Sequence, residues 1–301
     1  MLLGMSRSVF SHLGIAILAF GAGLGIAALY FDSQQQSLLQ TFHSLRRTEG
    51  EFSLIHPLIA YETPEATTFD EYQQLKSRIK RLIDAEVQKG GVSEVSVYYR
   101  NQETGAWIGI NEEAYYYPAS LLKVPVMIAY LKLAESNPDL LEKHIKYRPI
   151  TGGDPFEAES GLESGKTYRV KELIEHMIID SDNGATYTLI DAIDSRTLNA
   201  VYSDLGIVQP DQDTSTYQIS TKTYALFFRV LYNATYLSPR YSQMALEILT
   251  RASYTDGLTD GVPENTPVAH KFGEHVVSRN RTDAEGVELH DCGIVYFPSQ
   301  T

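Results

Sequence analysis

Residues Pro118–Leu131 read PASLLKVPVMIAYL, and the fold of the chain is organised around this stretch. Lys123 is its only charged residue. Because a helix that is apolar on all sides is buried, the stretch predicts a central helix of the core. A lysine in such a helix either extends its amine to the surface or is desolvated, and desolvation lowers its pKa.

Ser120 precedes Lys123 by three residues, which places the hydroxyl and the amine one turn apart on one helix face. The amine can accept the hydroxyl proton, and a helix N-terminus favours a developing negative charge. Ser120 is therefore a candidate nucleophile; the alternative is a capping serine beside a surface-reaching lysine. A second Ser-x-x-Lys pair, Ser77 and Lys80, lies among charged residues, and we expect it to be a solvated helix face.

Two further segments carry candidate chemistry. Ser181-Asp182-Asn183 follows a helical apolar stripe, although these residue types are also common at helix ends and turns. Lys271 lies in a strand-like run and is followed by Gly273. A glycine inside a strand often marks the close approach of a ligand. Each segment is weak support when taken alone.

Together and in this order, the segments resemble the serine beta-lactamase and penicillin-binding-protein superfamily, class A in particular. The matching motifs are Ser120-x-x-Lys123, Ser181-Asp182-Asn183 and, imperfectly, His270-Lys271-Phe272-Gly273. The resemblance covers about residues 68–298. It implies an α/β (α+β) fold of the beta-lactamase/DD-peptidase type, with an antiparallel sheet flanked by helices and an all-helical subdomain.

The resemblance implies a role for each site residue. Ser120 would attack an amide or lactam carbonyl, and Lys123 would accept its proton. Ser181 would pass a proton to the leaving nitrogen, while Lys271 would keep the site electropositive. The other implied contacts are the substrate side-chain amide at Asn183, an oxyanion hole from the backbone N–H groups of Ser120 and Glu274 beside Gly273, and an aromatic at the cleft rim, Tyr147. No metal or cofactor is implied.

The residue pattern along the chain agrees with such a fold. A capping box at Thr68 opens a helix that ends at Gly90, and the runs 95–99 and 106–110 predict a strand hairpin. A helical middle follows over about 120–252, and strand-like runs return at 268–272 and 289–297. Strands from both ends and helices between them predict one sheet with a helical insertion.

Three features depart from the family pattern. Class A enzymes carry a glutamate that activates the hydrolytic water, but no glutamate lies between residues 175 and 247, which leaves Asp211 or Asp213 as alternatives. Phe272 stands where a hydroxyl residue would bind the substrate carboxylate. The family fold also continues into a central strand and a closing helix. The residues before Thr301 supply neither, so we expect either a truncated sequence or an incomplete sheet.

The N-terminal part of the chain predicts membrane attachment. Leu13–Phe31 holds 19 residues without a charge, about 28 Å as a helix, with Arg7 before it and Asp32 after it. The run is longer than the apolar region of a signal peptide, so we expect an uncleaved anchor, with a cleaved signal as the alternative. The predicted parts are a cytoplasmic N-terminus (1–12), a transmembrane anchor (13–31), a linker (32–66) and an extracytoplasmic hydrolase domain (67–301).

Composition narrows the possible partners. The 301 residues carry a net charge of −13, which repels phosphate backbones and argues against nucleic-acid binding. With Cys292 as the single cysteine, an intrachain disulfide and a cysteine-based metal cluster are excluded. The expected partners are a beta-lactam or peptidoglycan-like small substrate and the membrane; the oligomeric state is left open.

The sequence therefore predicts a membrane-anchored serine hydrolase that is acylated at Ser120. The alternatives are a non-hydrolytic beta-lactam or peptidoglycan-peptide binding protein, a D-Ala-D-Ala peptidase or transpeptidase, and a catalytically inactive domain.

Overall fold

The computed structural model describes residues 44–46, 52–56, 58–61, 69–103, 105–149, 161–210, 216–278 and 285–297. The predicted cytoplasmic segment and anchor, residues 1–31, lie outside these ranges, as do Asp211 and Asp213. Among the helices within the described ranges, none is both long and apolar enough to cross a membrane.

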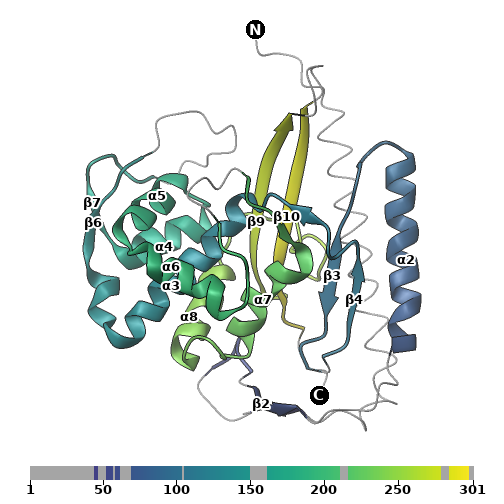
Figure 1. Cartoon of the computed structure of the whole chain (residues 1–301), viewed down its shortest axis with the longest axis horizontal. Helices are drawn as coiled ribbons and strands as arrows, with labels where there is room; N and C mark the ends of the chain where they lie inside the picture. The colour runs from purple at the N-terminus through teal and green to yellow at the C-terminus, as the bar shows by residue number, and fades with distance from the viewer. Residues whose placement is uncertain are drawn as a thin grey trace.

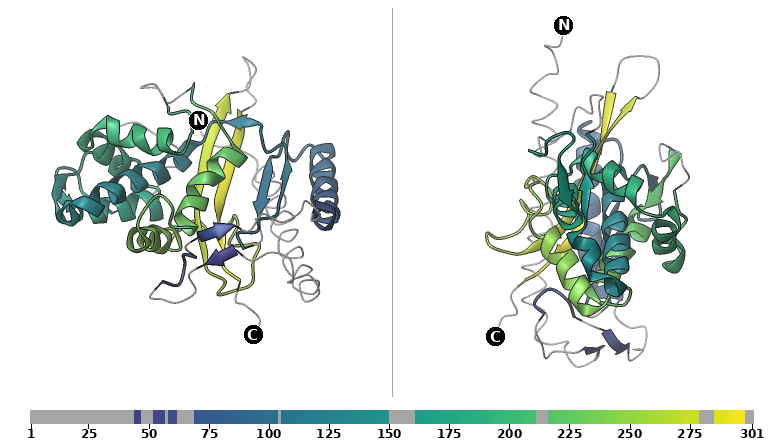
Figure 2. Two further views of the ribbon diagram at one scale, coloured as in Figure 1. Left: turned by 60° about the horizontal axis from the view of Figure 1, so that its bottom comes forward. Right: turned by 90° about the vertical axis from the view of Figure 1, so that its left-hand side faces the viewer.

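A long strand hairpin stands at the centre of the molecule, with helices on one side and a shorter hairpin on the other (Figures 1 and 2). The central strands are β9 (Val268–Ser278) and β10 (Glu285–Val295). The helical side contains α3 (Lys123–Ser136), α4 (Val170–Ile179), α5 (Asn183–Ala192), α6 (Ser195–Asp204) and α8 (Pro239–Leu249), while α7 (Thr221–Tyr232) lies against the central hairpin. The other side contains β3 (Val97–Arg100), β4 (Trp107–Ile110) and α2 (Phe69–Gln88).

Short elements complete the described fold. They are the strand pairs β1 (Ser44–Arg46) with β2 (Leu58–Tyr61), β5 (Tyr115–Tyr116) with β8 (Ile219–Ser220), and β6 (His144–Lys146) with β7 (Thr167–Arg169), and the 3₁₀ turns η2 (Ala119–Leu122) and η3 (Pro138–Glu142). The predicted helical middle is thus confirmed in its main part and is interrupted by these short strands.

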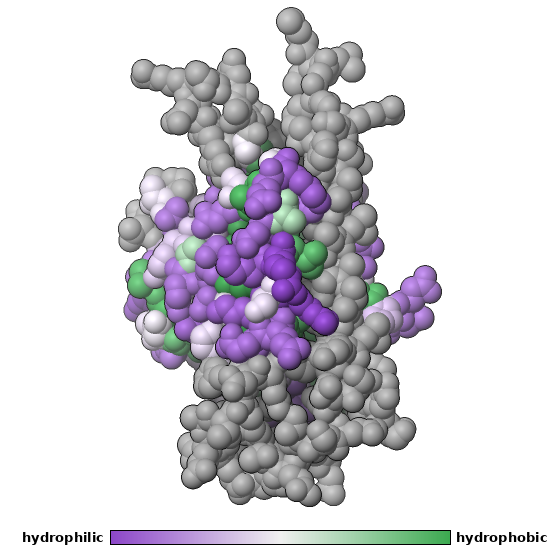
Figure 3. Space-filling view, turned by 90° about the vertical axis from the view of Figure 1, so that its right-hand side faces the viewer, coloured by the Kyte–Doolittle hydropathy of each residue, from purple (hydrophilic) through white to green (hydrophobic). Residues whose placement is uncertain are grey.

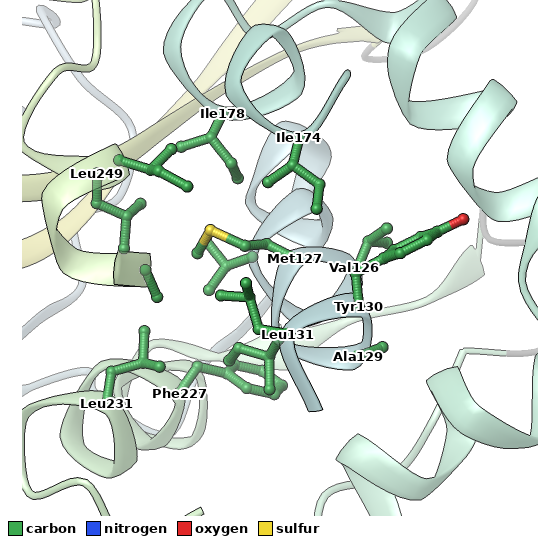
Figure 4. Packing of buried hydrophobic residues seen from close by; sticks show 14 of the residues in the cluster. Val126, Met127, Ala129, Tyr130, Leu131, Ile174, Ile178, Phe227, Leu231 and Leu249 are labelled. Carbon is green, nitrogen blue, oxygen red and sulfur yellow. The ribbon is translucent and has the colours of Figure 1, made fainter. Parts of the chain in front are cut away.

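The predicted central helix is α3, and its residues from Lys123 to Leu131 are all buried. Met127, Ile128 and Ala129 have no exposed surface, and Leu131 is 1% exposed. Helices α4, α5, α6 and α8 pack around α3, and Figure 4 shows side chains of several helices meeting there. Burial of each large apolar side chain contributes roughly 1.5–3 kcal/mol. The helix that begins at Lys123 is therefore held rigidly.

The prediction of one sheet is wrong for the described residues. β9 pairs with β10 over its full length, and β3 pairs with β4, but the two hairpins belong to separate two-stranded sheets. Helix α7 contacts both β3 and β10. At its start the Thr221 hydroxyl lies 2.7 Å from the Ser96 hydroxyl, next to β3. Helix α7 thus contacts both hairpins, which share no backbone ladder in the described part of the chain.

The second Ser-x-x-Lys pair lies on the exposed face of α2, as predicted. Ser77 and Lys80 are both exposed, and Lys80 pairs with Asp84 one turn away at 3.0 Å. The opposite face of α2 buries Tyr72, Leu75 and Ile79 against β3 and β4. Figure 3 shows mainly hydrophilic residues on the outer side of the molecule where α2 lies. This pair is therefore an internal control for the one at residue 120.

Part of the predicted linker is docked onto the helical side. Ile55 is buried, the backbone N–H of Leu54 donates to Gln243 in α8, and the backbone N–H of His56 donates to the Tyr232 carbonyl at the end of α7. The His56 ring also stacks on Tyr232. Residues 52–56 therefore belong to the folded part of the chain.

Candidate active site

Ser120 lies in the tight turn η2, directly before α3 begins at Lys123. Its side chain is half-buried and keeps access to solvent. Ala119 before it has a φ of 50°, a left-handed conformation that is strained for a residue with a Cβ. The Tyr224 hydroxyl of α7 donates to the Leu121 carbonyl at 2.8 Å, and this hydrogen bond attaches the turn to α7. The Ser120 hydroxyl is thus presented by a constrained backbone.

Lys123 is buried, with 3% of its surface exposed, and its amine reaches the loop between α4 and α5. Its Nζ donates to the Ser181 carbonyl and to Asn183 Oδ1, the latter at 2.7 Å. It also lies 2.9 Å from Ser120 Oγ and 3.0 Å from Ser181 Oγ. Two amine hydrogens therefore meet oxygens that can only accept, and the remaining direction faces the hydroxyls. In its neutral form this amine would point its lone pair at the hydroxyl of Ser120.

The α4–α5 loop divides its polar side chains between structure and site. Ser181 has a φ of 57° and, like Asn183, turns toward Lys123. Asp182 is instead the N-cap of α5, where its carboxylate accepts the backbone N–H of Ala185. The interpretation as a polar cap thus holds for Asp182, whereas Ser181 and Asn183 contact Lys123.

Tyr147 does not lie at the rim of the site, so this expectation needs correction. It is 4% exposed, and its hydroxyl donates to the Asp182 carboxylate at 3.3 Å. Its ring end lies where a Cβ at Gly184 would clash, so the glycine makes room for it. Because a buried aromatic cannot contact a ligand at the surface, Tyr147 supports the loop from beneath.

Lys271 enters the same site from β9 and has no exposed surface. Its Nζ donates to Ser181 Oγ and to the Phe272 carbonyl, each at 3.0 Å. Burial, and secondarily the charge of Lys123, lowers the pKa of Lys271 well below its ordinary value, while Asp291 and Glu274 oppose the shift. Ser181 Oγ also lies 3.0 Å from Lys123 Nζ, so this hydroxyl is held between the two amines.

Gly273 allows β9 to pass directly over the Ser120 turn. A Cβ at this position would lie 3.0 Å from the Pro118 carbonyl oxygen and 3.1 Å from the backbone nitrogen of Ser120. The sequence pattern suggested that a ligand comes close to Gly273. The structure shows that the backbone of the Ser120 turn does so. Glu274 follows immediately in β9, so its backbone borders the turn that presents Ser120.

The sequence pattern did not predict two contacts at β9. His270 is 1% exposed and pairs through Nδ1 with Asp291 of β10 at 2.8 Å, and Asp291 also accepts the backbone N–H of Leu258. The Phe272 ring stacks on Tyr254, with centroids 4.3 Å apart and an interplanar angle of 19°. The sequence carries no signal for them, because residues 254–261 form an irregular loop without periodicity.

Cys292 pairs with Lys271 across the hairpin and packs against the main core, as predicted for a small core residue. Within the described residues, no group of three or more His, Cys, Asp or Glu side chains could hold a metal ion. Ser120, Lys123, Ser181 and Lys271 bring two hydroxyls and two amines together.

The burial of Lys271 predicts a pH-dependent stability difference. Because its pKa is lowered on folding, the unfolded chain binds more protons between the folded and the ordinary pKa, and stability rises with pH there. Lys271→Met should therefore raise the free energy of unfolding by about 1 kcal/mol or more at pH 7, and by less as the pH approaches 10. Urea denaturation at both pH values measures the difference.

The matched control is Lys80→Met on the exposed face of α2, which should change the free energy by a similar small amount at both pH values. A Lys271→Met variant that is less stable than the parent at pH 7 and equally so at pH 10 would contradict the burial cost assigned to this amine.

Comparison with known proteins agrees with this geometry. The model of the beta-lactamase enzyme family (Beta-lactamase2) matches residues 74–301. A search of curated proteins found no significant match. Among solved structures, the chain is similar to a beta-lactamase from Chitinophaga pinensis, with 19% identity and a TM-score of 0.60 over 72% of this chain and 85% of that one. A beta lactamase from Xanthomonas campestris gives 21% and 0.59 over 73% and 84%.

PBP-A is similar with 22% identity and a TM-score of 0.53 over 67% of this chain and 76% of that one, and a variant of it was solved as an acyl-enzyme complex with penicillin G. At these identities the structural likeness concerns the fold. The family model spans most of the chain and includes all three predicted motifs. The chain therefore belongs to the beta-lactamase enzyme family, within the serine beta-lactamase and penicillin-binding-protein superfamily.

Proposed function

We propose that this chain is a serine hydrolase in which beta-lactams or related amides acylate Ser120. The observation that carries the proposal is the 2.9 Å contact between Ser120 Oγ and Lys123 Nζ, with Lys123 held from its other side by the α4–α5 loop. A buried amine beside a hydroxyl on a constrained turn is the arrangement that activates a serine.

The acylation step uses four side chains. The Ser120 oxygen forms a bond to the carbonyl carbon, and its proton passes to Lys123. The bond between that carbon and the lactam or amide nitrogen breaks. Ser181, which lies 3.0 Å from each lysine amine, donates its proton to the leaving nitrogen, and Lys123 restores it. Backbone N–H groups at Ser120 and Glu274 would hold the oxyanion.

The second step, release of the acyl group by water, has weaker support. The described carboxylates between residues 175 and 247 are engaged elsewhere, and in the described part of the chain the Ser120 side chain has a hydrogen bond to Lys123 alone. The hydrogen-bond partners of these five carboxylates are His176 for Asp180, Ala185 and Tyr147 for Asp182, Arg148 for Asp191, Arg196 for Asp194 and Tyr236 for Asp204.

A long-lived acyl-enzyme follows from this arrangement. The second candidate function is therefore that of a penicillin-binding or peptidoglycan-peptide protein that is acylated but turns over slowly. The penicillin G complex of PBP-A supports this candidate, because that protein has a similar fold. D-Ala-D-Ala peptidase or transpeptidase activity would use the same acyl-enzyme with another acceptor.

The proposal places the hydrolase outside the cytoplasm, attached by one N-terminal span. Its support is the uncharged run Leu13–Phe31 with Arg7 on its N-terminal side. A membrane anchor would keep the site near substrates of the cell wall.

We predict that Ser120 is the acylated residue. Intact-mass spectrometry after prolonged incubation with benzylpenicillin should show one adduct, which Ser120→Ala abolishes and Ser77→Ala leaves in place. Lys123→Ala should slow acylation by about 10²–10⁴, since a general base is lost, whereas Lys80→Ala should have little effect. An adduct that survives Ser120→Ala would refute the assignment.

We predict that deacylation is slow, because the described carboxylates between residues 175 and 247 are hydrogen-bonded to other partners. Nitrocefin should give a burst of about one equivalent followed by a nearly flat phase in stopped-flow absorbance. Sustained turnover above about 10 s⁻¹ would show that a base is present. Asp211→Asn and Asp213→Asn would then identify it.

We predict that residues 13–31 anchor the protein. The full chain expressed in a bacterium should sediment with membranes and resist carbonate extraction, while a variant that lacks residues 1–31 should be released. A mature N-terminus beyond Phe31 would show a cleaved signal instead.

A further inference from the structure

The amine of Lys271 is fully occupied inside the protein. Two of its donors meet Ser181 Oγ and the Phe272 carbonyl, each at 3.0 Å. In the third direction lies the Phe272 ring, with its centroid 4.0 Å from Nζ, a cation–π distance. The side chain has no exposed surface. An arriving anion therefore finds no available donor on this lysine.

The Phe272 ring is held over the amine by a second aromatic side chain. Tyr254, from the loop after α8, stacks on it with centroids 4.3 Å apart and planes 19° from parallel. That loop is fastened to the hairpin, because Asp291 of β10 binds both the backbone N–H of Leu258 and the buried His270. We call Phe272 and Tyr254 the aromatic cover. Their stacking and the attachment of the Tyr254 loop to β10 hold the two rings in place.

The surroundings of the aromatic cover are acidic. Burial, and secondarily the charges of Glu274, Asp291 and Asp256, raises the pKa of the Tyr254 hydroxyl. Glu274 is half-buried and Asp256 is exposed, so neither carboxylate is sealed inside the protein. A carboxylate entering here would lose hydration and meet like charges without gaining a hydrogen bond from Lys271.

We propose that the aromatic cover closes the carboxylate position of the site, so that the preferred acyl donors carry an uncharged group beside the bond that is cleaved. This inference rests on the proposed acylation of Ser120 and names its substrate class. Neutral lactams, amides or esters with an apolar group at this position would pack on Phe272 and Tyr254. Phe272 is thereby a specificity-determining residue.

A matched pair of substrates tests the proposal. Benzylpenicillin and its methyl ester share the same lactam and differ only in the carboxylate. The second-order rate constants for acylation of Ser120, followed by intact-mass spectrometry, should be at least tenfold higher for the ester with the parent protein. Phe272→Thr, which removes the cover and supplies a hydroxyl, should lower this ester-to-acid ratio at least tenfold.

The control variant is Phe297→Thr, since Phe297 is exposed just beyond β10, and it should leave the ratio unchanged. A parent protein that prefers the acid, or a Phe272→Thr ratio equal to that of the parent, would overturn the proposal. If neither compound acylates Ser120, the proposed function fails. The preference is then decided by calorimetric binding of the two compounds to Ser120→Ala, where tighter binding of the acid overturns it and tighter binding of the ester supports it.

Discussion

The buried amine of Lys123 is the interaction on which the rest of the site depends. Placing an amine inside the apolar helix α3 is costly unless its hydrogens find acceptors. The Ser181 carbonyl and the Asn183 side chain provide them. The α4–α5 loop must therefore lie against the start of α3, and the left-handed backbone of Ser181 is part of what that position requires. Loss of the Asn183 side chain would remove one of these two acceptors from the buried amine.

The second constraint is the approach of β9 to the same turn. Gly273 lets the strand pass within contact of the Ser120 backbone, which brings Lys271 onto the other side of Ser181. Two amines then share one hydroxyl, and the mutual repulsion of the two positive charges favours the loss of a proton from one of them. The proposed acylation needs one neutral amine to accept the Ser120 proton, and the closeness of the two lysines favours a neutral amine.

The same packing separates the two halves of the proposed reaction. Lys123 and Lys271 are buried and both contact Ser181, whereas described carboxylates between residues 175 and 247 are engaged in a helix cap and in surface ion pairs. The proposed acylation draws on the contacts among Ser120, Lys123 and Ser181, and the proposed slow hydrolysis on the engagement of these carboxylates. The aromatic cover over Lys271 acts on a third property, the choice of substrate, through desolvation and charge.

The sequence by itself determined the buried helix, the outer hairpin, the central strands and the three motifs. The signals for these are local: an apolar run around Lys123, alternation in strands, and spacing between Ser120, Ser181 and Lys271. The different surroundings of Ser77 and Ser120 were also readable from neighbouring charges. Only the tertiary structure decided that Asp182 caps a helix while its neighbours face Lys123, and that Tyr147 is buried beneath them.

Likewise, the stacking of Tyr254 on Phe272 and the separation of the two hairpins depend on contacts between distant parts of the chain. Local periodicity reports which face of an element is apolar, but it does not report which element will cover that face. For this protein the sequence therefore predicted which residues form the candidate site. The packing of distant elements decided how accessible each of these residues is.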